Sequence, residues 1–377
     1  MMLYIHVPFC KSRCIYCDFY STTCLSLRTD YVEAVCNEIH ERTDYLPTRR
    51  LDTIYLGGGT PSQLSLASLE TLFECIKSHF DIDPNAEVTV ETNPDDVTPE
   101  FVEGLHRLPV NRVSLGVQTF SDEQLQFLHR RHSAAQVNQA VQRLHDAGYF
   151  NISIDLIYGL PGQTLAQWSR DVDEALSLPV QHLSAYALIY EEGTQLWRLR
   201  EQGSVREAED ELSLAMFECL IDKACSAGFE HYEISNFARP GMRSRHNSGY
   251  WDDVPYLGVG PGAHSFNGVS RRWNNPDLNA YVKAHGLTEC CHLYGDELLT
   301  EDMLHNETVM KRLRTCEGID LVSFEKRFGE RSRHELLLNA RPYINKGELL
   351  LSDDNKKLRL SRSGIFISDG IMSALFR

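Results

Sequence analysis

The sequence lacks the long apolar segments that mark membrane-spanning or exported proteins. No stretch approaches the roughly 20 apolar residues that an α-helix needs to cross a bilayer. The first residues, MMLYIHVPFC, contain neither a basic segment nor an extended apolar core, so we expect no signal peptide. These absences predict a cytoplasmic protein without an integral membrane segment.

Positive charge is also scarce. The 377 residues contain 37 Lys and Arg against 53 Asp and Glu, a formal net charge of −16 at pH 7. Such a chain is repelled by nucleic acid and by anionic lipid surfaces. Residues 301–377 are more basic, with 14 Lys and Arg against 12 Asp and Glu, but they contain no dense basic helix. We therefore expect no nucleic-acid partner.

A disulfide framework is missing as well. The chain has 11 cysteines, and their spacing is irregular apart from one group of three near the start. This pattern differs from that of a small secreted scaffold and favours a reducing compartment. The other eight are interpreted as ordinary buried thiols. Among them, the neighbouring Cys290 and Cys291 are interpreted as a chance pair in a loop rather than a redox switch.

The chain does contain a repeated alternation of short β-rich runs and helical patterns. Six such repeats predict an α/β fold with a parallel sheet. Periodicity alone leaves two arrangements open, a doubly wound open sheet and an incomplete (β/α) barrel. The expected strands cover residues 3–7, 53–56, 87–91, 112–117, 152–157 and 183–188.

Helix-capping residues fall between these strands, where helices have to begin and end. A Ser or Thr followed by Pro, or three residues later by Gln, indicates a helix start, and Gly indicates a helix end. The start signals are Thr98 with Pro99, Ser121 with Gln124 and Thr164 with Gln167, and the end signals are Gly148 and Gly228.

Two further regions follow residues 1–235. Residues 236–300 are rich in Gly, Pro, Asn and aromatic residues and are expected to form an ordered connecting loop region. Residues 301–377 begin with helical patterns, and residues 347–360 alternate around Asp354 and Asn355 like a hairpin. Helices followed by a hairpin predict a small winged-helix-like domain that covers the barrel mouth or docks a partner.

In a parallel sheet of either kind, side chains at the carboxyl ends of the strands line one site. The residues expected there are cysteines, glycines and isolated polar groups, which makes them candidates for a cofactor cavity. They are Cys10, Cys14 and Cys17 after the first strand, residues 57–61 after the second, Glu91 in the third, Gln118 after the fourth, Asp155 in the fifth and Ala187 in the sixth.

The three cysteines have a CxxxCxxC spacing on one short segment. Thiolates at this spacing can point to a single centre, which suits an iron–sulfur cluster or a zinc ion. A structural zinc ion needs a fourth ligand, and the sequence offers neither a second CxxC pair nor HxxxH, although Cys24 or His6 could serve. We favour a cluster with one iron left open for another ligand, and zinc or free thiols are the alternatives.

The segment YIHVPFCKSRCIYCDFYS resembles the cluster loop of radical S-adenosylmethionine (SAM) proteins, and specifically of their HemN/HemW group. The resemblance covers nearly the whole chain, because YLGGGTPS, VETNPDD, SLGVQTF, IDLIYGLPGQT, SAYALIYEEGT and GVGPGAHS follow in that group's order. It implies a partial (β/α)6 barrel and a [4Fe–4S] cluster whose open iron takes the amino and carboxylate groups of SAM. It also implies a protein reductant such as flavodoxin or ferredoxin.

The resemblance further assigns residues around these cofactors. It places SAM beside Gly58, Gly59 and Thr60, a segment that is no P-loop because the Lys-Ser/Thr ending is absent. By matching motif, Tyr4 and Tyr16 flank the cluster and contact SAM, Glu91 lies near the SAM ribose or amino group, and Gln118, Arg130 and Asp155 correspond to positions that serve a second SAM in the HemN type.

Two features favour the HemW heme-chaperone branch of this group. Phe19 stands where HemN-type coproporphyrinogen dehydrogenases have a further cysteine, and HNSGYW resembles the HNxxYW motif linked to heme binding. An imidazole can bind heme iron while aromatic rings cover the macrocycle. His246, Tyr250 and Trp251 are therefore the expected heme contact, and His264 is a second ligand candidate.

The resemblance thus implies a heme chaperone that binds a [4Fe–4S] cluster and SAM. It would carry heme as cargo to heme-accepting apoproteins, and it could form a homodimer. The alternative is an oxygen-independent coproporphyrinogen III oxidase or another radical SAM oxidoreductase of porphyrin metabolism.

Overall fold

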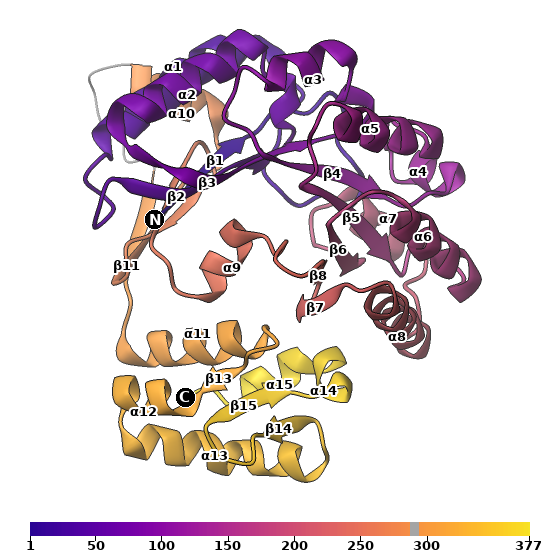
Figure 1. The fold of residues 1–377 in the computed structure, drawn as a ribbon, viewed down its shortest axis with the longest axis vertical. Helices are drawn as coiled ribbons and strands as arrows, with labels where there is room; N and C mark the ends of the chain where they lie inside the picture. Colours follow the sequence, from indigo (N-terminus) through magenta and orange to yellow (C-terminus); the bar gives the residue numbers. More distant parts are fainter. Residues whose placement is uncertain (287–293) are drawn as a thin grey trace.

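A twelve-stranded sheet forms the centre of the computed structural model, which describes residues 1–286 and 294–377. Its middle six strands are parallel, pair in sequence order and form a curved layer (Figure 1). In the described residues the sheet has two separate ends, so the expected partial barrel is confirmed as an open arc. The six strands are β1 (Met2–Val7), β2 (Arg50–Gly58), β3 (Asp81–Thr92), β4 (Arg112–Gln118), β5 (Ile152–Tyr158) and β6 (His182–Ala187).

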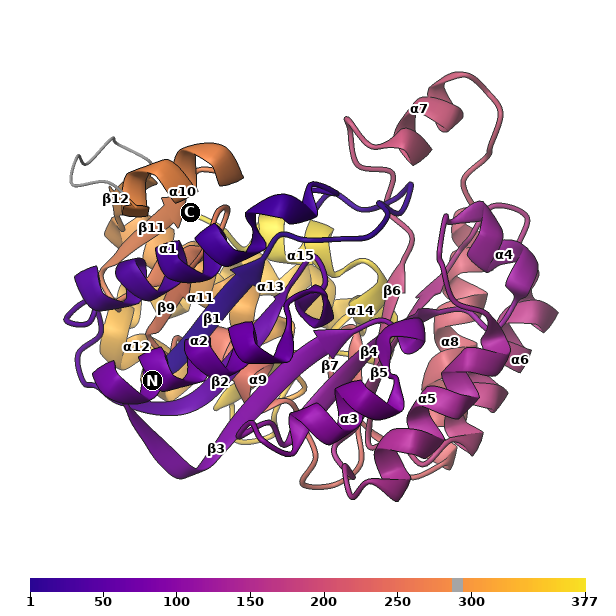
Figure 2. The same cartoon turned by 90° about the horizontal axis from the view of Figure 1, so that it is seen from above.

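Helices cover the outer face of this arc, and α7 stands apart from the body on two long connections (Figures 1 and 2). The capping signals are confirmed: the Thr98 hydroxyl accepts a hydrogen bond from the Phe101 amide, and Thr164 forms a capping box with Gln167. None of the described helices is long and apolar enough to cross a membrane. The helices are α1 (Arg28–Glu41), α2 (Leu66–His79), α3 (Pro99–Leu105), α4 (Asp122–Phe127), α5 (Ala134–Asp146), α6 (Leu165–Ser177), α7 (Gln195–Glu201) and α8 (Asp210–Ser226).

The connecting region differs from the ordered loop that the sequence analysis expects. Its strand β9 pairs in parallel with β1, so the sheet continues beyond the first strand. Leu257 and Val259 in this strand are fully buried, which explains why it covers the edge of β1. A four-residue strand between glycine-rich turns has too little periodicity to be recognised. The elements around it are β7 (Glu230–Glu233), β8 (Asn236–Ala238), α9 (Arg245–Trp251), β9 (Tyr256–Val259), β10 (His264–Phe266), β11 (Ser270–Asn274), α10 (Leu278–Gly286) and β12 (Tyr294–Leu298).

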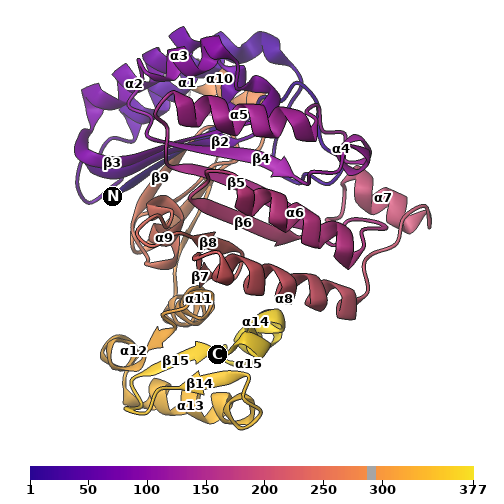
Figure 3. The same cartoon turned by 45° about the vertical axis from the view of Figure 1, so that its right-hand side comes forward.

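The C-terminal domain combines helices with a three-stranded sheet in the order β13-β15-β14. The predicted hairpin is present, and Asn355 takes a left-handed φ of 54° in its turn. Helix α11 and its C-cap residue Arg314 lie near both ends of the large sheet, because Arg314 pairs with Glu233 on β7 and Glu307 pairs with Arg271 on β11. The domain therefore lies across the open side of the arc (Figure 3). Its elements are α11 (Glu301–Leu313), β13 (Ile319–Asp320), α12 (Leu321–Phe328), α13 (Glu330–Asn345), β14 (Leu349–Leu351), β15 (Lys357–Leu360), α14 (Arg362–Phe366) and α15 (Ser368–Ala374).

The cysteines outside the N-terminal group are less buried than expected. Cys24, Cys225 and Cys316 are exposed, and Cys36 and Cys75 are partly exposed on helix surfaces. The interpretation of these residues as buried thiols is therefore wrong: Cys24 and Cys316 lie in exposed connections, and Cys36 and Cys75 pack only partly against the core. The pair Cys290 and Cys291 lies outside the described residues.

Candidate functional site

The three N-terminal cysteines lie on a loop that backbone hydrogen bonds hold in place. The Cys10 amide donates to the Thr22 carbonyl at 2.9 Å, and the Thr22 amide donates to the Pro8 carbonyl at 2.7 Å. In the middle of the loop, Ile15 is 3% exposed and its amide donates to the Leu128 carbonyl. The loop is thus closed at its base and anchored between helices, so its cysteines have defined positions.

These cysteines line a cavity of about 440 Å³ at the carboxyl ends of the parallel strands. The topology brings most of the sequence-predicted site residues to this one place, because neighbouring parallel strands end at the same edge. The predicted residues in its lining are Cys10, Cys14, Tyr16, Cys17, Gly58, Gly59, Thr60, Glu91, Gln118, Arg130, Asp155 and Ala187.

The three thiols are partly buried, and a cation lies beside one of them. Burial raises the pKa of Cys10, and it raises the pKa of Cys17 to about 11. Nη1 of Arg130 donates to Sγ of Cys14 at 3.4 Å and places a cation beside the sulfur ligands. In the described chain, no three His, Cys, Asp or Glu side chains are placed to hold one metal ion. A cubane binds each thiolate through a different iron, so its ligands line a cavity rather than surround a point.

Two glycines after β2 let the backbone approach this cavity closely. Gly58 has a φ of 105°, and a Cβ there would lie 2.5 Å from the His6 imidazole. A Cβ on Gly59 would lie 2.8 Å from the Val7 carbonyl oxygen. Both positions therefore require glycine. The next residue, Thr60, has its hydroxyl 3.6 Å from Sγ of Cys10, so the glycine segment and the cysteine loop adjoin.

Two carboxyl groups face the cavity from the sheet. Glu91 accepts hydrogen bonds from the Tyr55 hydroxyl at 2.6 Å and from the Gly58 amide at 3.1 Å. Burial raises its pKa to about 7, and burial also raises the pKa of Asp155 to about 6. Asp155 interrupts β5, whose other residues are buried. Carboxyl groups with raised pKa values in a cavity are candidates for binding amino or hydroxyl groups of a ligand.

Gln118 is the last residue of β4 and does not follow the strand as expected. The register between β4 and β5 shifts between Gly116 and Gln118, and Gln118 has a left-handed φ of 72°. This β-bulge redirects the end of the strand and leaves Gln118 in the lining of the cavity. A local deviation of this kind has no periodic signal in the sequence, and strained backbone is typical of binding sites.

Arg130 connects three parts of the site. Besides Cys14, its guanidinium donates to the side-chain oxygen of Asn93 and to the Gly116 carbonyl. Its Nε atom is buried without a hydrogen-bond partner. Asn93 is missing from the sequence-predicted set, although it directly follows β3 in VETNPDD and could have been found by the strand-end rule.

Exposed apolar side chains form a rim around the cavity, and they are absent from the sequence-predicted set. Phe19 is 61% exposed, Ile189 is 64% exposed and Tyr186 is 44% exposed, and all three belong to the lining. Exposed apolar side chains gathered at a cavity indicate contact with an apolar ligand or partner. Tyr186 and Ile189 lie at and just beyond the end of β6, where the strand-end rule named only Ala187.

Tyr4 and the HNxxYW residues lie outside the cavity lining. The Tyr4 hydroxyl lies 3.0 Å from Nδ1 of His6. His246 is 1% exposed, with Nδ1 2.7 Å from the Thr53 hydroxyl and Nε2 2.9 Å from the Tyr250 hydroxyl. Both ring nitrogens are thus occupied in this conformation, because α9 packs against β2, and heme contact by His246 stays a prediction. Burial lowers the pKa of His246 to about 3.

Trp251 and His264, the other expected heme contacts, also lie outside the lining of the cysteine cavity. The Trp251 ring at the end of α9 faces the Arg314 guanidinium, 5.1 Å from the ring centroid. His264 is exposed on β10, and its ring centroid is 6.2 Å from that of Trp273. These positions place Trp251 at the C-terminal domain and His264 on the strands added beyond β1.

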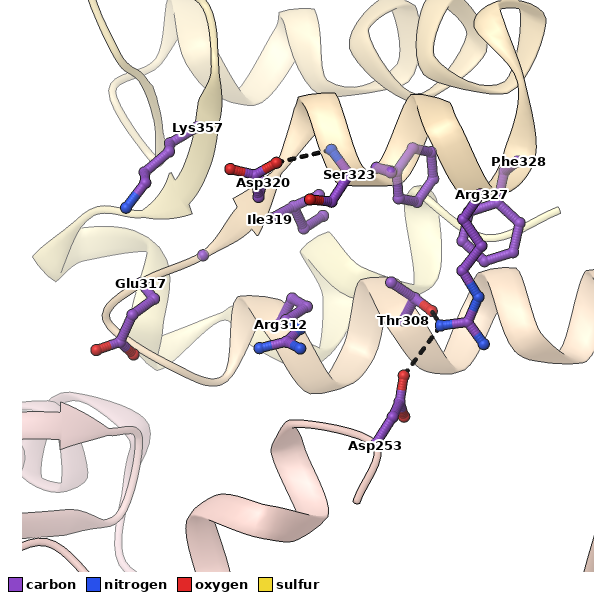
Figure 4. Close-up of a pocket in the computed structure, with 12 residues that line it drawn as sticks. Asp253, Thr308, Arg312, Glu317, Ile319, Asp320, Ser323, Arg327, Phe328 and Lys357 are labelled. Atoms are coloured by element: carbon purple, nitrogen blue, oxygen red, sulfur yellow. Dashed lines mark hydrogen bonds and ion pairs between the residues drawn. The ribbon is translucent and has the colours of Figure 1, made fainter. Parts of the chain in front are cut away.

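A second cavity, of about 330 Å³, lies between the connecting region and the C-terminal domain (Figure 4). Asp253 lines it from the connecting region, and its carboxylate accepts from Lys311 at 2.7 Å and from Arg327 at 3.1 Å. Asp320 caps α12 through the Ser323 amide at 2.7 Å. Because these charged groups pair within the protein, this cavity is a domain interface rather than a second cofactor site.

Comparison with known proteins agrees with this arrangement. The family model of the radical SAM superfamily matches residues 4–175, and that of the HemN C-terminal domain matches residues 299–367. The chain is 36% identical to a protein of Mycobacterium tuberculosis named heme chaperone HemW, with 99% of this chain and 94% of that protein covered. It is 37% identical to a Bacillus subtilis protein of the same name, with 86% of each covered. The solved structure of coproporphyrinogen III oxidase (HemN) from Escherichia coli shares the fold, with a TM-score of 0.85, 22% identity and coverage of 99% of this chain and 89% of that chain. The chain therefore belongs to the HemW family within the radical SAM superfamily.

Proposed function

We propose that this chain is a heme chaperone of the HemW type, which binds a [4Fe–4S] cluster and SAM and delivers heme to acceptor proteins. Membership of the radical SAM superfamily implies the cluster and SAM. The observation that supports their location is the meeting of Cys10, Cys14 and Cys17 with the Gly58–Gly59 backbone in one cavity. The heme function follows from the names of the relatives that match nearly the whole chain.

Each residue of the cavity has a proposed role that follows from its chemistry. The three thiolates would each bind one iron of the cluster. The backbone of Gly58 and Gly59 and the Thr60 hydroxyl would hydrogen-bond to SAM beside the open iron. Glu91 accepts from the SAM ribose or amino group, as its place beside the Gly58 amide supports. Tyr16 flanks the cluster and contacts SAM, and Gln118, Arg130 and Asp155 complete the polar lining, where a second SAM would bind. Tyr4 lies outside this lining, with its hydroxyl 3.0 Å from Nδ1 of His6. When bound and reduced, the cluster supplies the electron that cleaves SAM.

Phe19 supports the chaperone over the porphyrinogen oxidase. At this position the resemblance expects a cysteine in the HemN-type dehydrogenases, and here the side chain is a 61% exposed phenyl ring at the cavity rim. An exposed aromatic ring offers apolar contact to a porphyrin. It offers no thiol for redox chemistry.

The heme contact itself involves His246, Tyr250 and Trp251 only if α9 moves. Heme ligation by His246 requires its bonds to Thr53 and Tyr250 to open. A movement of the C-terminal domain, which contacts Trp251 through Arg314, would permit this. A flavodoxin or ferredoxin as reductant, a cytoplasmic location and a homodimer as the assembled form belong to the same proposal.

One anaerobic preparation tests the proposal. After cluster reconstitution, we expect one heme per chain in an absorbance titration, and no decarboxylation of coproporphyrinogen III with SAM and a reductant. Turnover of coproporphyrinogen would contradict the chaperone function and favour the oxidase. Absence of heme binding by the reconstituted protein would remove the heme function altogether.

A further inference from the structure

Two thiols and two imidazoles meet on the surface of α1 and α2. Cys36 and His40 lie one turn apart on α1, and Cys75 and His79 lie one turn apart on α2. Residues four apart share one face of a helix, so each pair is presented together. Nδ1 of His40 lies 3.0 Å from Nε2 of His79, and Nδ1 of His79 lies 3.8 Å from Sγ of Cys75. The four groups therefore form one contiguous cluster, and none of them lines the cluster cavity.

The Cys75 thiol on α2 reaches the backbone of Cys36 on α1. The Cys75 thiol lies 3.7 Å from the Cys36 carbonyl oxygen, to which it can donate. A hydrogen bond between the thiols raises the pKa of Cys36 and lowers the pKa of Cys75 to about 7, and the charge of His79 lowers the latter further. One sulfur thus has thiolate character while its neighbour keeps a proton.

The exposed cysteines Cys225 and Cys316 lack this combination. Burial raises the pKa of Cys225 and of Cys316, although both residues are more exposed than Cys75. A thiolate at neutral pH, access to solvent and a second thiol in contact are the properties of redox-sensitive cysteines. Among these residues, Cys75 with Cys36 has all three.

We propose that Cys75 and Cys36 form a redox-sensitive pair, which hydrogen peroxide converts into a disulfide between α1 and α2. The Cys75 thiolate attacks one peroxide oxygen, the O–O bond breaks, and the released hydroxide takes up a proton to become water. Cys36 then attacks the sulfur of the resulting sulfenic acid, the S–O bond breaks, and the second oxygen leaves as water. In total, two thiols lose two electrons and two protons, and one peroxide becomes two waters.

The position of the pair connects it to the cofactor site. Helix α1 follows the cysteine loop, and α2 follows the glycine segment of residues 57–59. A disulfide would join the two βα units that carry the cluster ligands and the proposed SAM backbone contacts. The proposal depends on the cluster of Cys36, His40, Cys75 and His79 and holds whether or not the chain carries heme.

Cysteine with histidine is also a typical ligand set for zinc. However, no three metal-binding side chains in the described ranges are placed to hold one ion. The approach of the Cys75 thiol to Cys36 instead favours sulfur–sulfur chemistry, which needs only these two residues. Zinc binding is therefore the competing outcome of the test.

The test uses the full-length protein with its cluster reconstituted anaerobically. After brief exposure to hydrogen peroxide, remaining thiols are alkylated and the peptides are identified by mass spectrometry. We expect a peptide that joins Cys36 to Cys75 and has lost two hydrogens. Before oxidation, alkylation of Cys75 at pH 7 should be about tenfold faster than that of Cys225, because a larger fraction is thiolate.

Variants separate the roles of the two cysteines. In Cys36→Ser, the sulfenic acid of Cys75 has no partner thiol and should be trapped by dimedone. Cys225→Ser is the matched control and should leave the linked peptide unchanged. Equal oxidation of Cys75 and Cys225 without a linked peptide would overturn the proposal. So would one zinc ion per chain that protects both thiols from alkylation and is lost in Cys75→Ser.

Discussion

Nδ1 of His246 lies 2.7 Å from the hydroxyl oxygen of Thr53, a residue 193 positions earlier in the chain. This contact joins α9 to β2, and the Tyr250 hydroxyl, which also belongs to α9, holds the other ring nitrogen, Nε2. The residues that follow α9 then pair with the C-terminal domain, Asp252 with Arg312 among them. In this conformation the HNxxYW motif connects the barrel to the C-terminal domain, and any heme ligation by His246 has to replace that connection.

Replacing His246 by alanine should therefore destabilise the protein by about 3 kcal/mol, because it leaves two buried hydroxyl groups unpaired and creates a cavity. Urea unfolding of the metal-free protein measures this change. The exposed His264→Ala is the control and should stay within about 0.5 kcal/mol of the parent. Loss of heme binding in His246→Ala with unchanged stability would instead identify His246 as a direct ligand.

Replacing Cys14 by serine should abolish the visible absorbance of the reconstituted cluster, because the cavity then offers two thiolates instead of three. Iron and sulfide analysis of the reconstituted protein measures the loss. The exposed Cys24, which follows the three cysteines in the sequence, is a matched control, and Cys24→Ser should retain the full signal. Four irons retained in Cys14→Ser would refute the cysteine assignment.

Replacing Glu91 by glutamine should change how stability depends on pH. The folded-state pKa of about 7 lies above the ordinary value of 4.5, so Glu91 favours folding below pH 4.5 and loses this contribution as the pH rises to 7. At pH 8, Glu91→Gln should thus exceed the parent by about 2 kcal/mol, allowing for screening by water in the cavity. Near pH 4 the two proteins should coincide.

Urea unfolding at several pH values measures the effect of Glu91→Gln. The partly exposed Glu70 on α2 offers a control, since Glu70→Gln should show no comparable pH-dependent difference in stability from the parent. A difference between Glu91→Gln and the parent that is constant across the pH range would contradict burial as the cause of the raised pKa.

Replacing Arg130 by glutamine should weaken SAM binding at least about tenfold, because it removes a buried cation that joins Cys14 to Asn93. Equilibrium dialysis with the reconstituted protein measures the affinity. The neighbouring Arg131 pairs instead with Asp95 and Asp96, so Arg131→Gln should have a smaller effect. Equal losses in both variants would show that general charge, rather than the Arg130 contacts, is responsible.

Replacing Asp253 by asparagine should loosen the C-terminal domain. Burial alone would raise the pKa of Asp253, but Lys311 and Arg327 outweigh it and lower the pKa. The carboxylate therefore stabilises the fold above its ordinary pKa of about 3.8 and less as the pH falls below it. We expect a loss of about 1 kcal/mol at pH 7 and faster hydrogen exchange in α11. Asp354→Asn, in the exposed hairpin turn, should change neither quantity.

Much of the fold and of the cavity could be predicted from the sequence, because the relevant signals are local. The cysteines stand within one short segment, and Thr98 and Thr164 mark helix starts by their immediate neighbours. The order of strands in a parallel sheet then dictates which residues share its carboxyl edge. By this route the sequence predicts that Glu91 and Asp155 lie in the cavity, as the structure shows.

Other features depend on contacts between residues far apart in the chain, so they are visible only in the folded molecule. The pairing of β9 with β1, the hydrogen bond of His246 to Thr53 and the contact of Cys75 with Cys36 each join distant segments. Burial and partner contacts, rather than residue type, determine whether an imidazole is available as a ligand and whether a thiol ionises at neutral pH. Local sequence signals thus predict which chemical groups the protein has and the order of its parallel strands, whereas long-range packing determines which of those groups meet.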